Sequence, residues 1–175
     1  MIFPTNFLWG ASTSAFQVEG GYNEGGKGVA TTDLGARRPG IADNKVAADH
    51  YHHWKEDVDL MAELGLKVYR MGFAWSRIMP DATCTPNPEG LAFYDRLIDY
   101  LLEKGIEPLV TLYHFECPQA LVDAFGGWLD RKMIDAYLKY ATEVGEISLR
   151  CEPGVLTMYA VREKENPCRI TILET

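Results

Sequence analysis

Polar side chains lie near the ends of three apolar segments, each of which we predict to be a strand. Gln17 and Glu19 follow the first segment, Arg70 lies within the second, and His114 and Glu116 follow the third. Amide and imidazole groups can hydrogen-bond hydroxyl groups, and neighbouring aromatic rings can stack on the C–H side of a sugar. Taken singly, each of these residues is more often structural. Their shared placement favours a site for a polyhydroxylated ligand.

Two other motifs could carry chemistry but are better explained without it. Residues 21–27, GYNEGGK, fit the phosphate-binding pattern G-x-x-x-x-G-K, but Gly28 stands where Ser or Thr should hold magnesium, and no helix pattern follows. We interpret this stretch as a flexible loop. His50, His52 and His53 cluster without a third ligand at a familiar metal-binding spacing. We assign them to helix packing and the surface, and we predict no metal site.

The elements that must position these side chains repeat along the chain. Apolar residues recur at helical spacing over residues 49–64 and again over 87–104, and a glycine follows each run. Apolar segments typical of buried parallel strands come next, at residues 68–75 and 108–113. A third helix is predicted over residues 129–144. The sequence therefore contains the same helix-to-strand unit at least twice.

This repeat predicts the fold class. Helix, glycine, apolar residue and strand in that order are typical of β/α units and of a parallel sheet. Including the short first strand within residues 7–20, we predict three such units. Residues 20–48 are rich in glycine and lack apolar periodicity, so we predict a long surface loop there. In a β/α barrel the chemistry lies at the carboxyl ends of the strands, which is where the polar residues stand.

The character of the chain changes after residue 144. A strand is plausible at residues 155–161, and a short apolar segment occupies residues 170–173, but no clean helical period appears. We therefore divide the chain into residues 1–144, which hold the repeated units, and a divergent tail at residues 145–175. One interpretation of the tail is a degenerate fourth unit.

Composition excludes several functional classes. The chain has 175 residues and a net charge of −8, so nucleic acid is not an expected partner. No apolar run approaches the roughly 20 residues that span a bilayer, and residues 1–10 lack the features of a signal peptide. The four cysteines are widely scattered, which favours reduced thiols. We expect a cytoplasmic protein with no membrane partner.

Three segments resemble glycoside hydrolase family 1, the family of β-glucosidases and 6-phospho-β-glucosidases. They are FLWGASTSAFQVEGGYNEGGKG, DHYHHWKEDVDLMAELGLKVYRMGFAWSRIMP and EPLVTLYHFECPQALVDAFGGWLDRK. The resemblance implies a (β/α)8 TIM barrel, of which this chain would hold about three to four N-terminal units and be incomplete. It implies that Gln17 and His114 bind hydroxyls of the terminal sugar. Arg70 would lie beside the catalytic nucleophile and keep it ionised.

The resemblance also implies an activity. Members of the family hydrolyse O-glycosidic bonds of β-glucosides or 6-phospho-β-glucosides with retention of configuration, in carbohydrate metabolism and without a cofactor. The letters HFE after the third strand are closer to the bacterial 6-phospho branch, because plain β-glucosidases more often have Trp-Asp there. Both sugar classes remain open. The expected small-molecule partner is a sugar.

The catalytic carboxylates of the family are not found in this sequence, so the catalytic residues are unknown. The family's acid/base Glu lies in an Asn-Glu-Pro motif; here Glu152 stands in Cys-Glu-Pro, and an alternative alignment puts Ala160 at that position. The Thr-Glu-Asn-Gly motif of the nucleophile is absent. A complete barrel needs about 250 residues. The alternative function is therefore a non-catalytic truncated fragment with a partial sugar pocket, and we expect these 175 residues to be inactive alone.

Overall fold

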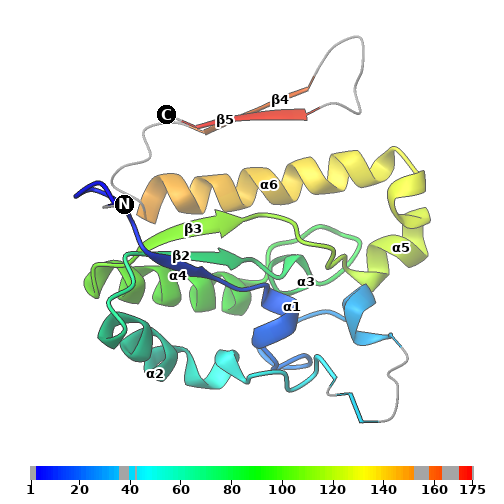
Figure 1. The fold of residues 1–175 in the computed structure, drawn as a ribbon. Helices are drawn as coiled ribbons and strands as arrows, with labels where there is room; N and C mark the ends of the chain where they lie inside the picture. The colour runs from blue at the N-terminus through cyan, green and yellow to red at the C-terminus, as the bar shows by residue number, and fades with distance from the viewer. Residues whose placement is uncertain (1–2, 36–39, 42, 152–157, 163–169, 175) are drawn as a thin grey trace.

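The fold was analysed in a computed structural model, which describes residues 3–35, 40–41, 43–151, 158–162 and 170–174. A three-stranded parallel sheet lies at its centre, in the order β1 (Gly10–Ser12), β2 (Val68–Gly72) and β3 (Glu107–Thr111) (Figure 1). All three strands run in the same direction, so their carboxyl ends meet at one edge. The α/β class and the parallel sheet predicted from the repeat are confirmed.

Three long helices accompany the sheet. They are α2 (His50–Glu63), α4 (Pro88–Glu103) and α6 (Lys132–Cys151). The middle helix, α4, contacts β3 and packs between α2 and α6. Its apolar face supplies much of the core, in which Trp75, Phe93, Tyr94, Leu97, Ile98, Leu101 and Tyr140 are all buried. The same helices therefore cover the sheet and fix the strand ends in place.

Local signals in the sequence set the bounds of α4. The side chain of Asn87 accepts a hydrogen bond from the backbone N–H of Glu89, and Pro88 occupies the first helical position. The helix ends before Gly105, whose φ of +70° is a left-handed conformation that costs little without a Cβ. These bounds match the predicted helix closely, because the signal that starts the helix and the signal that ends it are both local.

The second strand is shorter than predicted. β2 ends at Gly72, and residues 75–78 form the short helix α3 (Trp75–Ile78) instead of continuing the strand. The backbone N–H of Ala74 donates to the hydroxyl of Tyr94 at 2.7 Å, which removes it from the sheet ladder. All of α3 is buried. The apolar residues 73–75 are therefore buried beyond the end of the strand, where the chain turns into α3.

Short helices connect the larger elements. α1 (Ala15–Val18) follows β1 directly, and the 3-10 turn η1 (Thr31–Asp33) lies in the loop before α2. After β3 come α5 (Gln119–Phe125) and the 3-10 turn η2 (Gly127–Leu129). η1 lies within the loop predicted at residues 20–48, whereas α1, α5 and η2 were not predicted. Together these pieces bring side chains to the carboxyl edge of the sheet.

The end of the chain differs from the prediction. α6 continues through residue 144 to Cys151, so the expected loss of helical character comes about two turns late. β4 (Met158–Arg162) pairs antiparallel with β5 (Ile170–Glu174) in a sheet of its own. The division at residues 144/145 stays a prediction. Glu152 lies outside the described residues, whereas Ala160 is on β4.

Among the described residues, no helix combines the length and the apolar character that crossing a membrane requires.

Candidate functional site

Arg70 lies on β2, opposite Ser12 at the end of β1. Its Nη1 donates a hydrogen bond of 3.3 Å to the Ser12 hydroxyl. The guanidinium is therefore directed toward the end of the neighbouring strand, at the edge where the sequence placed the polar residues.

His114 follows β3 and is half-buried. Its Nδ1 lies 2.9 Å from the hydroxyl of Ser14, a buried residue just before α1. The ring of Phe16 meets the imidazole edge-on, with ring centroids 6.0 Å apart. The imidazole is thus held at Nδ1 and against one aromatic ring, and Nε2 makes no hydrogen bond within the described part of the chain.

Gln17 lies on α1, and its side chain is exposed. It makes no side-chain hydrogen bond to the described part of the chain. No hydrogen bond joins Arg70, His114 and Gln17 to one another within the described ranges. The structure instead brings all three to a single short segment, residues 12–17. Arg70 reaches this segment at Ser12, His114 reaches it at Ser14, and Gln17 belongs to it.

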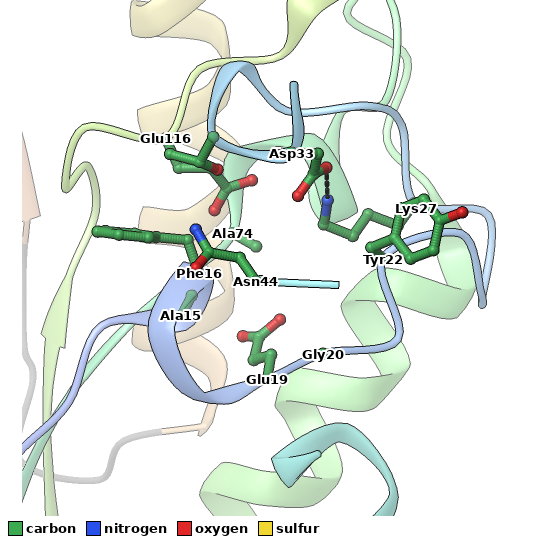
Figure 2. A pocket seen from close by; sticks show the side chains of 11 residues that line it. Ala15, Phe16, Glu19, Gly20, Tyr22, Lys27, Asp33, Asn44, Ala74 and Glu116 are labelled. Atoms are coloured by element: carbon green, nitrogen blue, oxygen red, sulfur yellow. Dashed lines mark hydrogen bonds and ion pairs between the residues drawn. The ribbon is translucent and has the colours of Figure 1, made fainter. Parts of the chain in front are cut away.

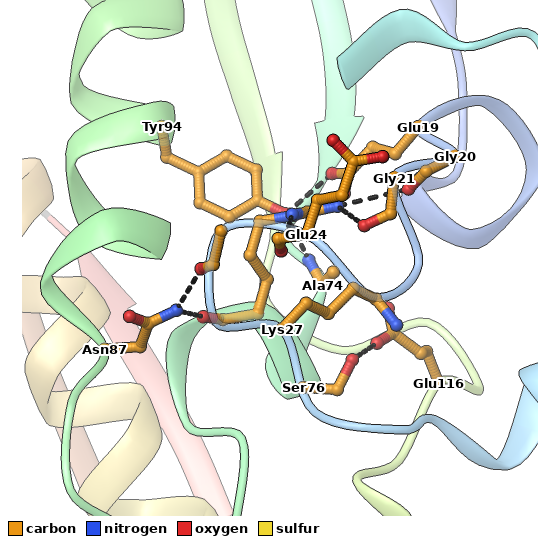
Figure 3. Close-up of polar contacts among 12 residues, drawn as sticks. Glu19, Gly20, Gly21, Glu24, Lys27, Ala74, Ser76, Asn87, Tyr94 and Glu116 are labelled. Carbon is orange, nitrogen blue, oxygen red and sulfur yellow. Dashed lines mark hydrogen bonds and ion pairs between the residues drawn. The ribbon is translucent and has the colours of Figure 1, made fainter. Parts of the chain in front are cut away.

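Behind this segment lies a buried ion pair between Arg77 and Glu19 (Figure 3). Nε of Arg77 donates to Oε2 of Glu19 at 3.0 Å, and the hydroxyl of Tyr94 donates to Oε1 at 2.6 Å. Burial raises the pKa of Tyr94 well above its ordinary value, and the negative charge of Glu19 raises it further. The phenol therefore stays protonated and remains a donor to the carboxylate.

The rest of the Arg77 guanidinium holds the loop that follows α1. It donates to the backbone carbonyls of Gly20, Gly21 and Glu24 at 3.2, 3.4 and 3.3 Å. The face of the guanidinium covers the ring of Tyr51 at 4.1 Å. Burial alone would lower the pKa of Arg77. Glu19, Tyr94 and Tyr51 together outweigh this effect, so the pKa of Arg77 is raised and the cation persists. This loop is anchored, which corrects the interpretation of residues 21–27 as flexible.

A small polar pocket opens beside this pair, between Glu19 and Glu116 (Figure 2). Lys27 and Asp33 form a 2.9 Å ion pair at its wall, and both side chains are about 6% exposed. Its lining also includes Ala15, Phe16, Gly20, Tyr22, Thr32, Asn44 and Ala74. Lys27 of the GYNEGGK motif is therefore occupied by a carboxylate of its own loop.

Glu116 is the most strongly perturbed carboxyl group in the described part of the chain. It is 3% exposed, and the hydroxyl of Ser76 donates to its Oε1. Burial raises its pKa to about 7, against a lowering by the nearby Lys27 charge. Glu116 therefore exchanges its proton near neutral pH, two residues after His114.

The three helix histidines are paired with acidic side chains. Nδ1 of His50 lies 2.6 Å from Asp57. His52 bridges Asp49 and Glu24 at 2.6 and 2.9 Å, and these carboxylates raise its pKa. His53 contacts Glu56 at 2.9 Å. In the described ranges, no three His, Cys, Asp or Glu residues are grouped so as to hold a metal ion.

Ser14, Ser76 and Lys27 received no role from the sequence, because serines and lysines in loops carry no signal of burial. For Arg77 the sequence did contain a signal of burial. It is a single charge within the apolar run of residues 71–79, which indicates a buried partner. The roles of Gln17, Arg70 and His114 stay predictions, because the structure gives their positions and contacts but contains no ligand.

Comparison with known proteins supplies a family match. The family described as Glycosyl hydrolase family 1 matches residues 1–147. Beta-glucosidase 25 of Oryza sativa subsp. japonica is 49% identical over 143 residues, which are 79% of this chain and 28% of that protein. Aryl-phospho-beta-D-glucosidase BglC of Bacillus subtilis (strain 168) is 48% identical over 142 residues, 79% of this chain and 30% of that protein.

Solved structures agree with this match. The psychrophilic β-glucosidase BglU from Micrococcus antarcticus superposes with a TM-score of 0.78 at 45% identity, covering 85% of this chain and 32% of that one. A rice β-glucosidase mutant in a covalent complex with Glc superposes with a TM-score of 0.76 at 42% identity, covering 86% of this chain and 31% of that one. The chain thus spans about a third of the proteins it resembles.

Proposed function

The chain belongs to glycosyl hydrolase family 1, and from that membership we propose that it is the sugar-binding N-terminal third of a retaining β-glucosidase or 6-phospho-β-glucosidase. Its parallel sheet matches the first third of the family's TIM-barrel structures. A β-glucosidase and an aryl-phospho-β-D-glucosidase are similar to it at nearly equal identity, 49% and 48%. The proposal therefore covers both the free sugar and its 6-phosphate.

The convergence of Gln17, Arg70 and His114 on residues 12–17 carries this proposal. The exposed Gln17 amide and the free Nε2 of His114 can each hydrogen-bond a hydroxyl group of a terminal sugar. Ser14 holds the other imidazole nitrogen at 2.9 Å, so the ring is oriented before a ligand arrives. A sugar pocket formed in this way begins at the carboxyl edge of the sheet, as expected for this type of fold.

The proposed chemistry needs two carboxyl groups about 5–5.5 Å apart, one acting as acid and base and the other as nucleophile. In our proposal Arg70 lies beside the nucleophile and stabilises its ionised form by an opposite charge. The two carboxyl groups would come from later units of the barrel. The residues described here bind and orient the sugar, and Arg70 tunes the charge of the attacking group.

A chimera tests the proposal. Residues 1–144 of this chain would replace the matching segment of Bacillus subtilis BglC, and the purified protein would be assayed with an aryl β-glucoside and with its 6-phosphate. We expect turnover, and a loss of kcat/KM in His114→Ala and Gln17→Ala that corresponds to roughly 1–3 kcal/mol per lost contact.

The matched control for this chimera is Gln119→Ala, which removes a Gln side chain that bonds only Asp123 on α5. We expect it to leave kcat/KM unchanged. A chimera that folds and turns over substrate equally well with and without the Gln17 and His114 side chains would contradict the proposed roles.

A further inference from the structure

Two buried polar atoms that line one pocket have no hydrogen-bond partner in the described part of the chain. They are Oε2 of Glu116 and Oγ1 of Thr32. The Glu116 side chain is 3% exposed, and its other oxygen is already taken by Ser76. Buried polar groups in native proteins are almost always paired, so two unpaired atoms in one pocket indicate a shared partner.

The charged groups of the same pocket are already satisfied. Asp33 accepts from Lys27 at 2.9 Å and from the backbone N–H of Ala30 at 2.8 Å. The carboxylate oxygens of Glu19 accept from Arg77 and Tyr94. The charges of Asp33, Lys27 and Glu19 are therefore all paired, and none of them requires an ionic ligand. Glu116 is the one group whose charge depends on whether it is protonated.

The size and the chemistry of the pocket limit which kind of molecule can occupy it. The pocket has room for about one water-sized molecule, and Figure 2 shows the carboxyl groups of Glu19 and Glu116 directed into it from opposite sides. An apolar molecule would leave both unpaired atoms without a partner. A metal ion would need a ligand cluster that the described ranges do not contain.

We propose that this pocket binds one structural water molecule, which hydrogen-bonds to Oε2 of Glu116 and to Oγ1 of Thr32 at the same time. Water both donates and accepts, so it can serve a carboxyl group in either protonation state and a hydroxyl that rotates. Buried waters of this kind satisfy polar groups that the protein itself cannot pair.

The water joins two loops that are distant in sequence. Thr32 lies in η1, and Glu116 lies in the turn after β3. The adjacent backbone already connects them, because the N–H of Thr31 donates to the carbonyl of Cys117 at 2.8 Å. The Cys117 N–H donates in return to Oγ1 of Thr31 at 3.4 Å. The proposed water extends this contact to the turn that carries His114. The water proposal does not depend on the proposed sugar binding.

High-resolution crystal structures of this chain test the proposal directly. In the wild type we expect an ordered water about 2.6–3.2 Å from both atoms. Thr32→Val replaces the hydroxyl with a methyl group of similar shape and should lose this water. Thr142→Val makes the same replacement on α6, at an exposed position that does not line the pocket, and should keep the water. In solution, water-to-amide cross-relaxation at Cys117 should follow the same pattern.

Three results would overturn the proposal: a dry pocket in the wild type, a water that persists unchanged in Thr32→Val, or density and coordination that belong to an ion. Thr32→Ser provides a second test should Thr32→Val fail to fold. It retains the hydroxyl and should retain the water, and its loss in a folded Thr32→Ser protein would equally contradict the site.

Discussion

The hydroxyl of Ser14 lies 2.9 Å from Nδ1 of His114, although the two residues are 100 positions apart in the chain. The contact joins the segment after β1 to the turn after β3, across the carboxyl edge of the sheet. It also determines which imidazole nitrogen is available to a ligand in the proposed site, because Nδ1 is engaged by the hydroxyl and Nε2 is the other ring nitrogen. Ser14 is therefore a positioning residue for His114 in the proposed sugar site.

The first prediction concerns this contact. In Ser14→Ala, the ¹⁵N shifts of the His114 ring should move, because Nδ1 loses its hydrogen-bond partner. The free energy of unfolding should fall by roughly 0.5–1.5 kcal/mol. Ser12→Ala is the matched control, since it removes a serine hydroxyl from the same segment without touching His114. Identical His114 spectra in Ser14→Ala and the wild type would contradict the assignment.

The second prediction concerns the pH dependence of stability through Glu116. Its pKa is about 7 in the folded state, against an ordinary value of 4.5. Between these values the folded state holds a proton that the unfolded state has released. The stabilisation from Glu116 is therefore complete below about pH 4.5, decreases as the pH rises, and is lost above about pH 7.

Glu116→Gln should remove this dependence, because the amide stays neutral and still accepts from Ser76. From urea unfolding at pH 5 and pH 8, the wild type should lose roughly 2–3 kcal/mol more than the variant. Glu107→Gln, at an exposed position on β3, should retain the wild-type slope. Parallel slopes in the wild type and Glu116→Gln would show that Glu116 titrates normally.

The third prediction concerns the Arg77–Glu19 pair. Arg77→Met leaves the Glu19 carboxylate buried and uncompensated, so the free energy of unfolding should fall by about 3–5 kcal/mol. Arg77→Lys should restore only part of this, because a lysine lacks the planar fork that reaches several carbonyls. Lys104→Met breaks an exposed pair with Asp59 and should change stability little. Equal losses in Arg77→Met and Lys104→Met would contradict the importance of the buried pair.

The fourth prediction applies to the active chimera. If Arg70 lies beside the nucleophile, Arg70→Met should raise the pKa of that carboxyl group and shift the acidic limb of the pH–rate profile to higher pH. Arg70→Lys should shift it less. Arg96→Met, on the exposed face of α4, should leave the profile unchanged. An unmoved acidic limb in Arg70→Met would place Arg70 away from the nucleophile.

The sequence predicted those parts of the fold that depend on local signals. Asn87 and Pro88 start α4, and Gly65 and Gly105 follow the helices in left-handed conformations, as the pattern indicated. The α/β class and the family followed from the repeat and from the three quoted segments, and both are confirmed.

The parts that were missed depend on distant partners. The bend after β2 requires the hydroxyl of Tyr94, 20 residues away, to take the backbone N–H of Ala74. The loop at residues 20–28 is ordered by a guanidinium more than 50 positions further along the chain. The spacing of apolar residues along the sequence carries no information about hydrogen bonds between such distant residues. The candidate site was predicted as a set of strand-end residues, but its supporting hydroxyls, Ser14 and Ser76, became visible only in three dimensions.

The hydrogen bonds from Arg77 to backbone carbonyls also restrict the length of the loop that follows α1. The carbonyls of Gly20, Gly21 and Glu24 accept from one guanidinium, and the Asn87 amide takes the carbonyl of Gly25 at 2.7 Å. One inserted residue can displace the chain by up to about 3.5 Å, more than a hydrogen bond tolerates. A substitution at the exposed Asn23 therefore leaves these contacts in place, whereas an insertion or a deletion between residues 20 and 25 breaks them.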